Sequence, residues 1–266
     1  MHPLLNIAIR AARRGGEIIA RAIPRLESVQ VQSKGRNDYV SEVDKAAEAE
    51  IIAIIRKSYP AHAIMAEESG ASGEHETRWI IDPLDGTTNF LHGFPTFAVS
   101  IAVEHRGRLE VGVVFDPMSQ ELFTATQGGG AHLDNHRVRV SKQRELEGAL
   151  LATGFPYRAT EEHMDAYLRM LRAMMMQTAG IRRPGAAALD LAYVAAGRVD
   201  GFWEIGLKPW DTAAGQLLIQ EAGGRLGTLT GAEYRFGGNL IAGTPKVYAA
   251  MVEAFAALVP ENLRNV

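Results

Sequence analysis

The sequence predicts an α+β fold in which helices and sheets lie in layers. Three features indicate this fold: two amphipathic helical segments come first, a series of strands separated by turns follows, and helices and strands then alternate toward the C-terminus. Elements that occur in such blocks are typical of layered α+β domains.

The two N-terminal helices are marked by their apolar spacing and by their ends. Apolar residues recur at near-helical spacing across residues 4–22, and Pro24 ends that pattern. The next helix is expected to begin at Ser41, because Ser41 and Asp44, three positions later, resemble a capping box. An apolar face follows, and Pro60 ends the helix.

The middle of the chain predicts an antiparallel meander. Residues 79–81 form a short apolar segment that is typical of a buried strand. Further strand-like segments, separated by turn sequences, are residues 97–104, 109–115 and 121–126. The run Gly128-Gly129-Gly130 predicts a tight turn rather than a phosphate-binding loop, because no helix follows it.

Helices and strands alternate after residue 150. The helices are predicted over residues 164–175, 186–196, 212–222 and 247–258, and the strands over residues 199–205 and 239–242. We expect one compact unit made of an N-terminal α+β subdomain, residues 1–145, and a C-terminal α/β subdomain, residues 146–266. The boundary between them is placed between Ser141 and Leu150.

The composition is that of an ordinary globular protein. Of the 266 residues, 47% are hydrophobic and 22% are charged, and the net charge of −3 gives no support for bulk attraction to nucleic acid or anionic lipid. The chain has no cysteine, which excludes disulfides, thiolate metal sites and a cysteine nucleophile. No apolar run approaches the roughly 18 residues that a membrane span needs, so we expect no membrane contact and a cytoplasmic protein without a signal peptide.

Asp82 and Asp85 lie three positions apart where the strand of residues 79–81 is expected to end, so both carboxylates can point to one place. Gly86 and Thr87 then offer backbone N–H groups where a helix can begin, which is a natural seat for a phosphate. Carboxylates repel such an anion unless a divalent cation lies between them, and oxygen ligands favour Mg²⁺ or Mn²⁺ over Zn²⁺. Taken alone, however, two acids in a turn are more often a solvated loop.

Three further polar segments support a site. Glu67 and Glu68 end a strand-like segment shortly before residues 79–81. Asp211 precedes a predicted helix, where it is either only the N-cap or both a cap and a metal ligand. The third segment is the polar, glycine-containing stretch of residues 34–38, which by itself would be a surface turn.

Together these segments resemble the signatures of the inositol monophosphatase family. The resemblance covers nearly the whole chain and rests on residues 79–90, on residues 210–224 and on the acidic pair at 67–68. Residues 1–3, 152–156 and 189–201 resemble the bacterial SuhB-type branch of that family. The resemblance implies the layered αβαβα fold that inositol monophosphatases share with fructose-1,6-bisphosphatases. It also implies a Mg²⁺-dependent, lithium-sensitive phosphatase that hydrolyses inositol-1-phosphate.

The resemblance implies that each active site holds two or three Mg²⁺ ions, with Mn²⁺ as an alternative. Glu67, Asp82 and the carbonyl oxygen of Leu84 would hold the first ion, and Asp82, Asp85 and Asp211 the second. Two cations roughly 3.5–4 Å apart can stabilise both the attacking water and the leaving oxygen of an in-line displacement.

The catalytic residues implied by the resemblance are Glu67 and Thr87, with Asp44 behind Thr87. They would orient the attacking water or accept its proton, so that no covalent nucleophile is needed. Lys34 and Asp38 fit the loop that completes the metal site in this family.

The substrate would be a small phosphorylated polyol. Asp85 would contact the substrate, and the N–H groups of Gly86 and Thr87 would bind its phosphoryl end. Glu204 would form hydrogen bonds with its hydroxyls, and Arg182, Gly185 and Ala186 would lie along the same rim. Arg182 is equally well interpreted as a surface or interface charge.

Several alternatives stay open from the sequence. Fructose-1,6-bisphosphatases, histidinol-phosphatases and nucleotide 3'-phosphatases share the Asp82-type signature, and residues 154–157 depart from the animal enzymes near the expected substrate wall. The family resemblance also implies a homodimer. The SuhB-type branch implies a second function as a binding protein in bacterial transcription antitermination and rRNA synthesis, with elongation factors or RNA polymerase as partners.

Overall fold

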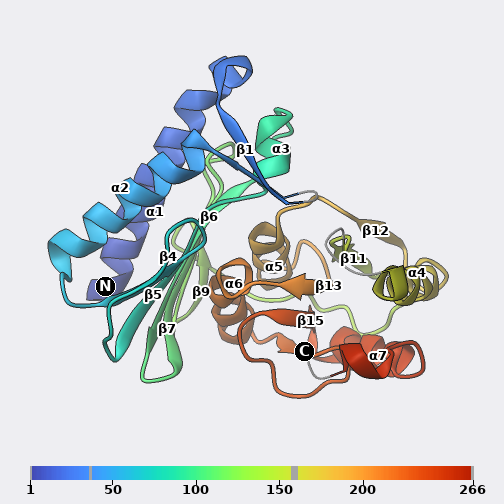
Figure 1. The fold of residues 1–266 in the computed structure, drawn as a ribbon. Coiled ribbons are helices and arrows are strands. Elements are labelled where there is room, and N and C mark those ends of the chain that lie inside the picture. The colour runs from blue at the N-terminus through green and yellow to red at the C-terminus, as the bar shows by residue number, and fades with distance from the viewer. Residues whose placement is uncertain (1, 36–37, 157–160, 265–266) are drawn as a thin grey trace.

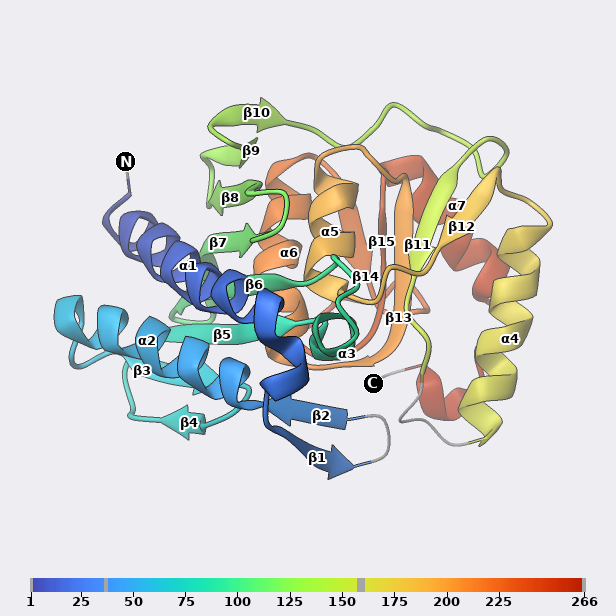
Figure 2. The same ribbon diagram turned by 90° about the horizontal axis from the view of Figure 1, so that it is seen from above.

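The fold consists of five layers, in the order helices, sheet, helices, sheet, helices (Figures 1 and 2). The computed structural model describes residues 2–35, 38–156 and 161–264. The three helix layers are α1 (Pro3–Ala22) with α2 (Glu42–Ser58), then α5 (Ala187–Ala195) with α6 (Pro209–Glu221), and finally α4 (Glu161–Met175) with α7 (Pro245–Phe255). This arrangement confirms the predicted αβαβα fold.

The larger sheet has eight strands in the order β10-β9-β8-β7-β6-β5-β3-β4. Its strands are β3 (Ala63–Ala66), β4 (Gly70–Ser72), β5 (Thr77–Asp85), β6 (Ala98–His105), β7 (Arg108–Phe115), β8 (Leu122–Thr126), β9 (Gly130–Leu133) and β10 (His136–Val138). All neighbouring strands are antiparallel except β3 and β5, which run parallel. The predicted meander is β6, β7 and β8.

The second sheet has five strands in the order β12-β11-β13-β15-β14. Its strands are β11 (Leu150–Thr153), β12 (Gly180–Arg182), β13 (Gly201–Leu207), β14 (Arg225–Gly227) and β15 (Gly238–Gly243). β11 is parallel to both of its neighbours, β12 and β13. A separate ribbon of β1 (Val31–Gly35) and β2 (Asp38–Ser41) precedes α2, and the short helix α3 (Thr87–Leu91) follows β5.

Three buried apolar clusters fill the spaces between the layers. One joins α1 and α2 to the outer face of the larger sheet, where Ala11, Ile51 and Trp79 are fully buried. The second lies between the two sheets around α5 and α6, and the third lies under α4 and α7. The middle layer therefore packs against both sheets and ties the two halves of the chain together. Among the described residues, none of the helices is long and apolar enough to cross a bilayer.

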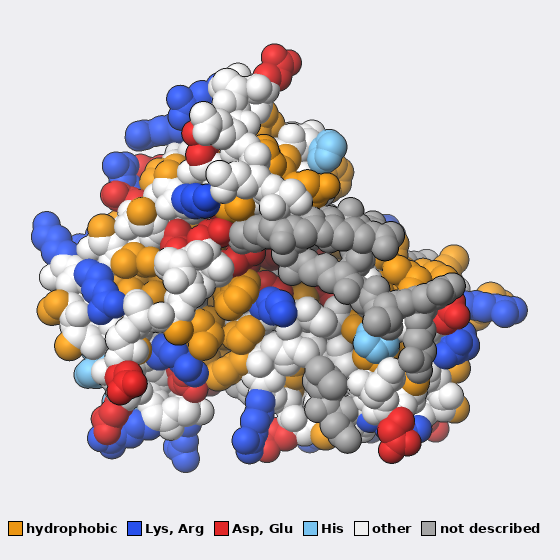
Figure 3. Space-filling view, viewed as in Figure 1, with side chains coloured by type: hydrophobic (Ala, Val, Ile, Leu, Met, Phe, Trp, Pro, Cys, Tyr) orange, Lys and Arg blue, Asp and Glu red, His pale blue; other side chains and the backbone are white. Residues whose placement is uncertain are grey.

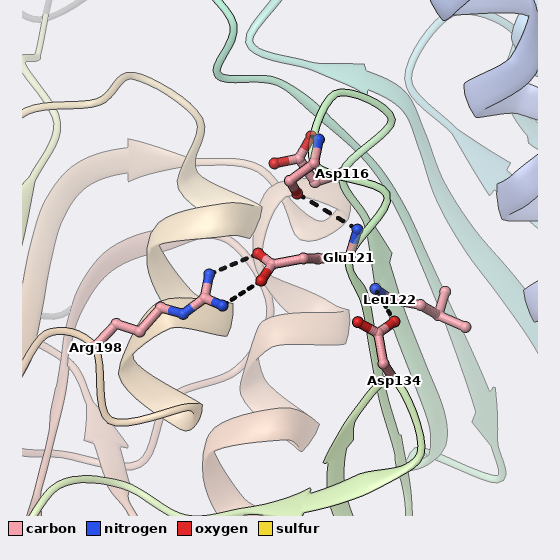
Figure 4. Close-up of polar contacts among 6 residues, drawn as sticks. Asp116, Glu121, Leu122, Asp134 and Arg198 are labelled. Atoms are coloured by element: carbon pink, nitrogen blue, oxygen red, sulfur yellow. Dashed lines mark hydrogen bonds and ion pairs between the residues drawn. The ribbon is translucent and has the colours of Figure 1, made fainter.

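An ion pair also connects α5 to the larger sheet. Arg198, just beyond α5, contacts Glu121, which directly precedes β8, with two nitrogens of its guanidinium group (Figure 4). Nη1 donates to Oε2 over 2.6 Å, and Nη2 donates to Oε1. The same guanidinium lies 5.0 Å from the ring centre of Tyr193. Such a two-pronged pair fixes geometry better than a single contact does.

The ends of some predicted elements are wrong. The helix predicted over residues 212–222 begins at Pro209, so Asp211 lies inside its first turn and is not the N-cap, which is Lys208. The prediction failed because Pro209 occupies the first helical position, where its missing N–H costs nothing. The last helix ends at Phe255 rather than at residue 258, and the strand predicted from residue 199 begins at Gly201.

Candidate active site

A cavity of about 1010 Å³ lies where β5 ends, and it receives residues from both halves of the chain. Acidic side chains gather near the centre of one face of the molecule (Figure 3). Among the predicted site residues, those that line the cavity are Glu67, Asp82, Leu84, Asp85, Gly86, Thr87, Gly185, Glu204 and Asp211.

A β-bulge at the end of β5 places two of the acids in the wall of this cavity. Asp82 pairs with Ser100 and Asp85 with Ala98, so three steps along β5 correspond to two steps along β6. The extra residue bends the strand, as bulges beside active sites often do. Asp82 is 2% exposed, and its Oδ1 accepts a hydrogen bond of 3.0 Å from the N–H of Leu84.

Gly86 turns the chain from β5 into α3. Its φ of 92° is one that side chains disfavour, and a Cβ at this position would lie 2.9 Å from the carbonyl oxygen of Thr96. Because of this turn, Thr87 comes back toward the strand. Its hydroxyl oxygen lies 3.0 Å from the carbonyl oxygen of Leu84 and 2.9 Å from Oδ1 of Asp44.

Asp44 links this turn to the first turn of α2. The predicted capping box is present: the N–H of Ser41 donates to Oδ2 of Asp44 over 2.9 Å, and the Ser41 hydroxyl accepts from the N–H of Asp44. Asp44 is fully buried, and this burial raises the pKa of its carboxyl group, while hydrogen bonds from Ser41 and Thr87 act in the opposite direction. Asp44 therefore lies behind Thr87, away from the cavity wall.

The remaining two acids come from neighbouring elements. Glu67 follows β3, and its N–H donates to the carbonyl oxygen of Ile81 over 3.1 Å, which keeps it beside β5. Asp211 lies in the first turn of α6, and its Oδ2 accepts a hydrogen bond of 2.7 Å from the N–H of Lys208.

The four acids influence one another's charge. Burial raises the pKa of both Asp82 and Asp85 well above the ordinary range, and the next causes are the negative charges of Glu67 for Asp82 and of Asp211 for Asp85. A bound divalent cation would offset this repulsion between the negative charges of the acids.

The donor chemistry therefore fits Mg²⁺ or Mn²⁺, because every side chain in the set offers oxygen. The present arrangement is not that of a closed ligand shell: in the described part of the chain, no group of three or more His, Cys, Asp or Glu side chains is placed so that it could hold a metal ion. Oδ2 of Asp85 and Oδ2 of Asp211 each accept a backbone N–H instead, from Ala188 and from Lys208.

The opposite wall of the cavity comes from the second half of the chain. Glu204 stands at a second bulge, where β13 gains one residue on β15 between Glu204 and Leu207. Gly185 and Ala187 precede and begin α5, whose Ala188 N–H donates to Asp85 over 2.7 Å. The side-chain amide of Asn89 donates to the carbonyl oxygen of Pro184 over 2.8 Å. These two contacts join the Asp85 turn to the start of α5.

Two predicted substrate contacts lie elsewhere. Arg182 is exposed, and its guanidinium group donates to the carbonyl oxygen of Ile181. Ala186 is 1% exposed. Neither residue is among those that line the cavity. The neighbouring Arg183 and Ala187 line it instead. The two arginines could not be told apart from the sequence, because the short strand β12, which decides where each of them lies, was not predicted.

The structure adds contacts that the sequence did not predict. The guanidinium carbon of Arg183 lies 4.9 Å from the ring centre of Phe155, and both residues line the cavity. Asp190, one helical turn beyond Ala187, is a buried acid whose charge interacts with those of Glu204 and Asp85. The side chains of Lys34 and Asp38 lie outside the described part of the structure.

Comparisons with known proteins agree on one family. The family model described as "Inositol monophosphatase family" matches residues 1–262. A protein named "Nus factor SuhB" from Pseudomonas aeruginosa is 55% identical over 271 aligned residues, which cover 100% of both chains. The crystal structure of the extragenic suppressor protein suhB from Bartonella henselae has a TM-score of 0.92 and 44% identity, and the match covers 96% of this chain and 98% of that one. The inositol monophosphatase from Anabaena has a TM-score of 0.84 and 37% identity, with 97% of each chain covered.

Proposed function

Because the chain belongs to the inositol monophosphatase family, we propose that it is a Mg²⁺-dependent phosphomonoesterase that hydrolyses inositol-1-phosphate and related small phosphate esters. The observation that carries this proposal is the convergence of four carboxylates, Glu67, Asp82, Asp85 and Asp211, on one cavity. The raised pKa values of Asp82 and Asp85, together with the oxygen donors of all four acids, support a site for hard cations beside a phosphate.

Two or three Mg²⁺ ions, or Mn²⁺ in their place, are part of the proposal. Glu67, Asp82 and the carbonyl oxygen of Leu84 would hold one ion, and Asp82, Asp85 and Asp211 another. When bound, such ions lower the pKa of a bound water and offset the negative charge of the phosphoryl group.

The chain's own residues position the reacting groups. Glu67 and Thr87 would orient the attacking water, and Asp44 would stabilise the Thr87 hydroxyl from behind, as their separation of 2.9 Å supports. The N–H groups of Gly86 and Thr87 would donate to the phosphoryl oxygens during in-line displacement. This chemistry requires no covalent intermediate.

The polyol part of the substrate would face the second half of the chain. Glu204 would accept hydrogen bonds from its hydroxyls, with Asp85 and the backbone around Gly185 beside it. For Arg182 and Ala186 a contact with the substrate stays a prediction, and their positions give it no support. The preference for inositol-1-phosphate over other small esters rests on the family alone.

A second function is supported by the names of the relatives. The protein called "Nus factor SuhB" from Pseudomonas aeruginosa is 55% identical to this chain over its full length. We therefore keep a role in bacterial transcription antitermination and rRNA synthesis, through elongation factors or RNA polymerase, as the alternative. The chain would have phosphatase activity as a secondary property in that case. A homodimer and a cytoplasmic location stay predictions.

The Asp85→Asn variant separates the two functions. Removing this charge should lower kcat/KM for inositol-1-phosphate by about 10²–10³-fold, the loss typical of one electrostatic group in a transition state. The variant is also introduced into a bacterium that lacks the protein. Loss of both activity and complementation supports the enzyme as the main function, whereas complementation by an inactive variant supports the binding function. Unchanged phosphate release would contradict the site assignment.

A further inference from the structure

Gly154 lies beside Glu204, at the boundary between the second sheet and the cavity. It directly follows β11, whose last residue, Thr153, is paired with Trp203 in the parallel strand β13. Gly154 is buried. The next residue along β13 is Glu204, so the carboxylate of Glu204 and the backbone of Gly154 are neighbours in the sheet.

The carboxylate of Glu204 occupies the space that a side chain at position 154 would need. A Cβ on Gly154 would lie 2.0 Å from Cδ and Oε2 of Glu204 and 2.1 Å from Oε1. These separations are far inside van der Waals contact. Glu204 can therefore take its observed position only because residue 154 has no side chain.

The need for glycine here is steric. Gly154 is not among the glycines with positive φ, unlike Gly86, whose φ is 92°. An alanine can adopt the backbone conformation of Gly154 without strain. The colliding atoms are the end of a long side chain, so an added methyl group should displace the Glu204 carboxylate and leave the backbone in place.

Asp190 restricts where that carboxylate can move. Asp190 is 1% exposed, and its pKa is raised by burial and then by the negative charge of Glu204. Movement of Glu204 toward Asp190 would bring two acids closer together in a buried region, which is unfavourable. Glu204 also lines the cavity, so a displaced carboxylate has space on that side, where the substrate's polyol part would lie.

We propose that Gly154 determines substrate specificity, because the absence of a side chain at this position lets Glu204 lie against the end of β11. There the Glu204 carboxylate accepts hydrogen bonds from the hydroxyls of a polyol phosphate. This inference rests on the proposed phosphatase function. It predicts that residue 154 affects substrates with hydroxyls on the leaving group and does not affect the phosphoryl end, which binds at the Asp85 turn.

The test compares Gly154→Ala with the parent chain on two substrates in Mg²⁺. For inositol-1-phosphate, we expect KM to rise about 10-fold, the effect of losing one hydrogen bond to a charged acceptor. For p-nitrophenyl phosphate, whose leaving group has no such hydroxyls, kcat and KM should stay within about twofold. Equal losses on both substrates, or an unchanged KM for inositol-1-phosphate, would overturn the proposal.

Gly180→Ala is the matched control. Gly180 lies in β12, the neighbour of β11, and it too is not among the glycines with positive φ. A Cβ at Gly180 would make only ordinary contacts, at 3.5 Å from Arg182 and 3.6 Å from Leu150. This variant should have the kinetics of the parent chain on both substrates. A KM change as large as that of Gly154→Ala would show that the effect is not specific to Glu204 and would refute the inference.

A double-mutant comparison with Glu204→Ala tests the link between the two residues. Glu204→Ala should raise KM for inositol-1-phosphate, and adding Gly154→Ala to it should change nothing further, because the colliding carboxylate is gone. Additive effects would contradict the proposal. If Gly154→Ala alone does not fold, the double variant should fold with the Tm of Glu204→Ala, and its failure to fold would refute the steric account.

Different results would contradict the phosphatase function and the role of Gly154. If the parent chain releases no phosphate from either substrate, the proposed function itself is wrong. If the parent chain is active and Glu204→Ala leaves KM for inositol-1-phosphate unchanged, the phosphatase assignment stands and the specificity inference is wrong.

Discussion

The carboxyl group of Asp190 lies in the first turn of α5, and among the described residues neither of its oxygens has a hydrogen-bond partner. Burying a polar group in this way costs free energy, and burying it as an ion costs more. Burial accordingly raises its pKa well above the ordinary value of 3.8, and the charges of Glu204 and Asp85 add to this effect.

The raised pKa of Asp190 should make the free energy of unfolding depend on pH. Because its pKa is higher in the folded than in the unfolded protein, the folded protein holds the Asp190 proton more tightly. The stabilisation that comes from this proton is complete below the unfolded pKa, and it disappears as pH rises through the folded pKa. Asp190→Asn should therefore be more stable than the parent chain at pH 7, by roughly 1–3 kcal/mol. Chemical denaturation from pH 4 to pH 7.5 measures the difference, which should grow with pH. A constant difference, or a less stable variant at pH 7, would contradict this account.

At the level of elements, the first turn of α2 serves both stability and the site. The Ser41 side chain accepts hydrogen bonds from the N–H groups of Val43 and Asp44, and Asp44 in turn contacts Thr87 at the cavity. Loss of the Ser41 hydroxyl removes the cap and also one of the groups that fix Asp44.

Ser41→Ala should lower the free energy of unfolding by about 1 kcal/mol, as loss of an N-cap typically does, and should also lower kcat. Thr244→Ala is the matched control, because Thr244 caps α7 through the N–H of Val247 and is not among the cavity residues. The control should lose similar stability and keep its kcat. Equal kcat values in the two variants would show that Asp44 does not need its cap for catalysis.

The elements differ in how far the sequence predicted them. α1, α2 and the β6–β8 meander follow from apolar periodicity and from Pro24, Ser41 and Pro60. The three-residue strands β4, β10, β12 and β14 were not predicted, because such short sequences contain too few positions to show a pattern. They are defined by pairing in the folded sheet. The same limit hid the surroundings of Arg183 and the contact between Gly154 and Glu204.

For the whole molecule, the site exists only because the five layers bring distant segments together. Glu67, Asp82 and Asp85 come from the first half of the chain, and Glu204 and Asp211 from the second. The acidic motifs were predictable from the sequence, whereas their separations and hydrogen bonds depend on packing between the sheets. The division at residues 141–150 stays a prediction, and α5 and α6 pack against both sheets.

Cation binding should therefore stabilise the whole fold. Since the carboxylates repel one another without a cation, Mg²⁺ should raise the Tm progressively, adding about 2.7 kcal/mol at a concentration 100 times its Kd. Differential scanning fluorimetry in MgCl₂, with NaCl of equal ionic strength as the control, measures this effect. Asp82→Asn should reduce the Mg²⁺ response and raise the Tm in EDTA. Equal responses to the two salts would contradict a specific cation site.

The central claim is that this cavity hydrolyses phosphate esters with the help of Mg²⁺ and Glu67. Phosphate release from inositol-1-phosphate, measured with Mg²⁺ and with EDTA for the parent chain and for Glu67→Gln, tests it most directly. We predict activity in the parent chain that requires Mg²⁺ and is lowered about 10²-fold or more by Glu67→Gln. Activity that persists in EDTA, or a Glu67→Gln variant as active as the parent chain, would contradict the account.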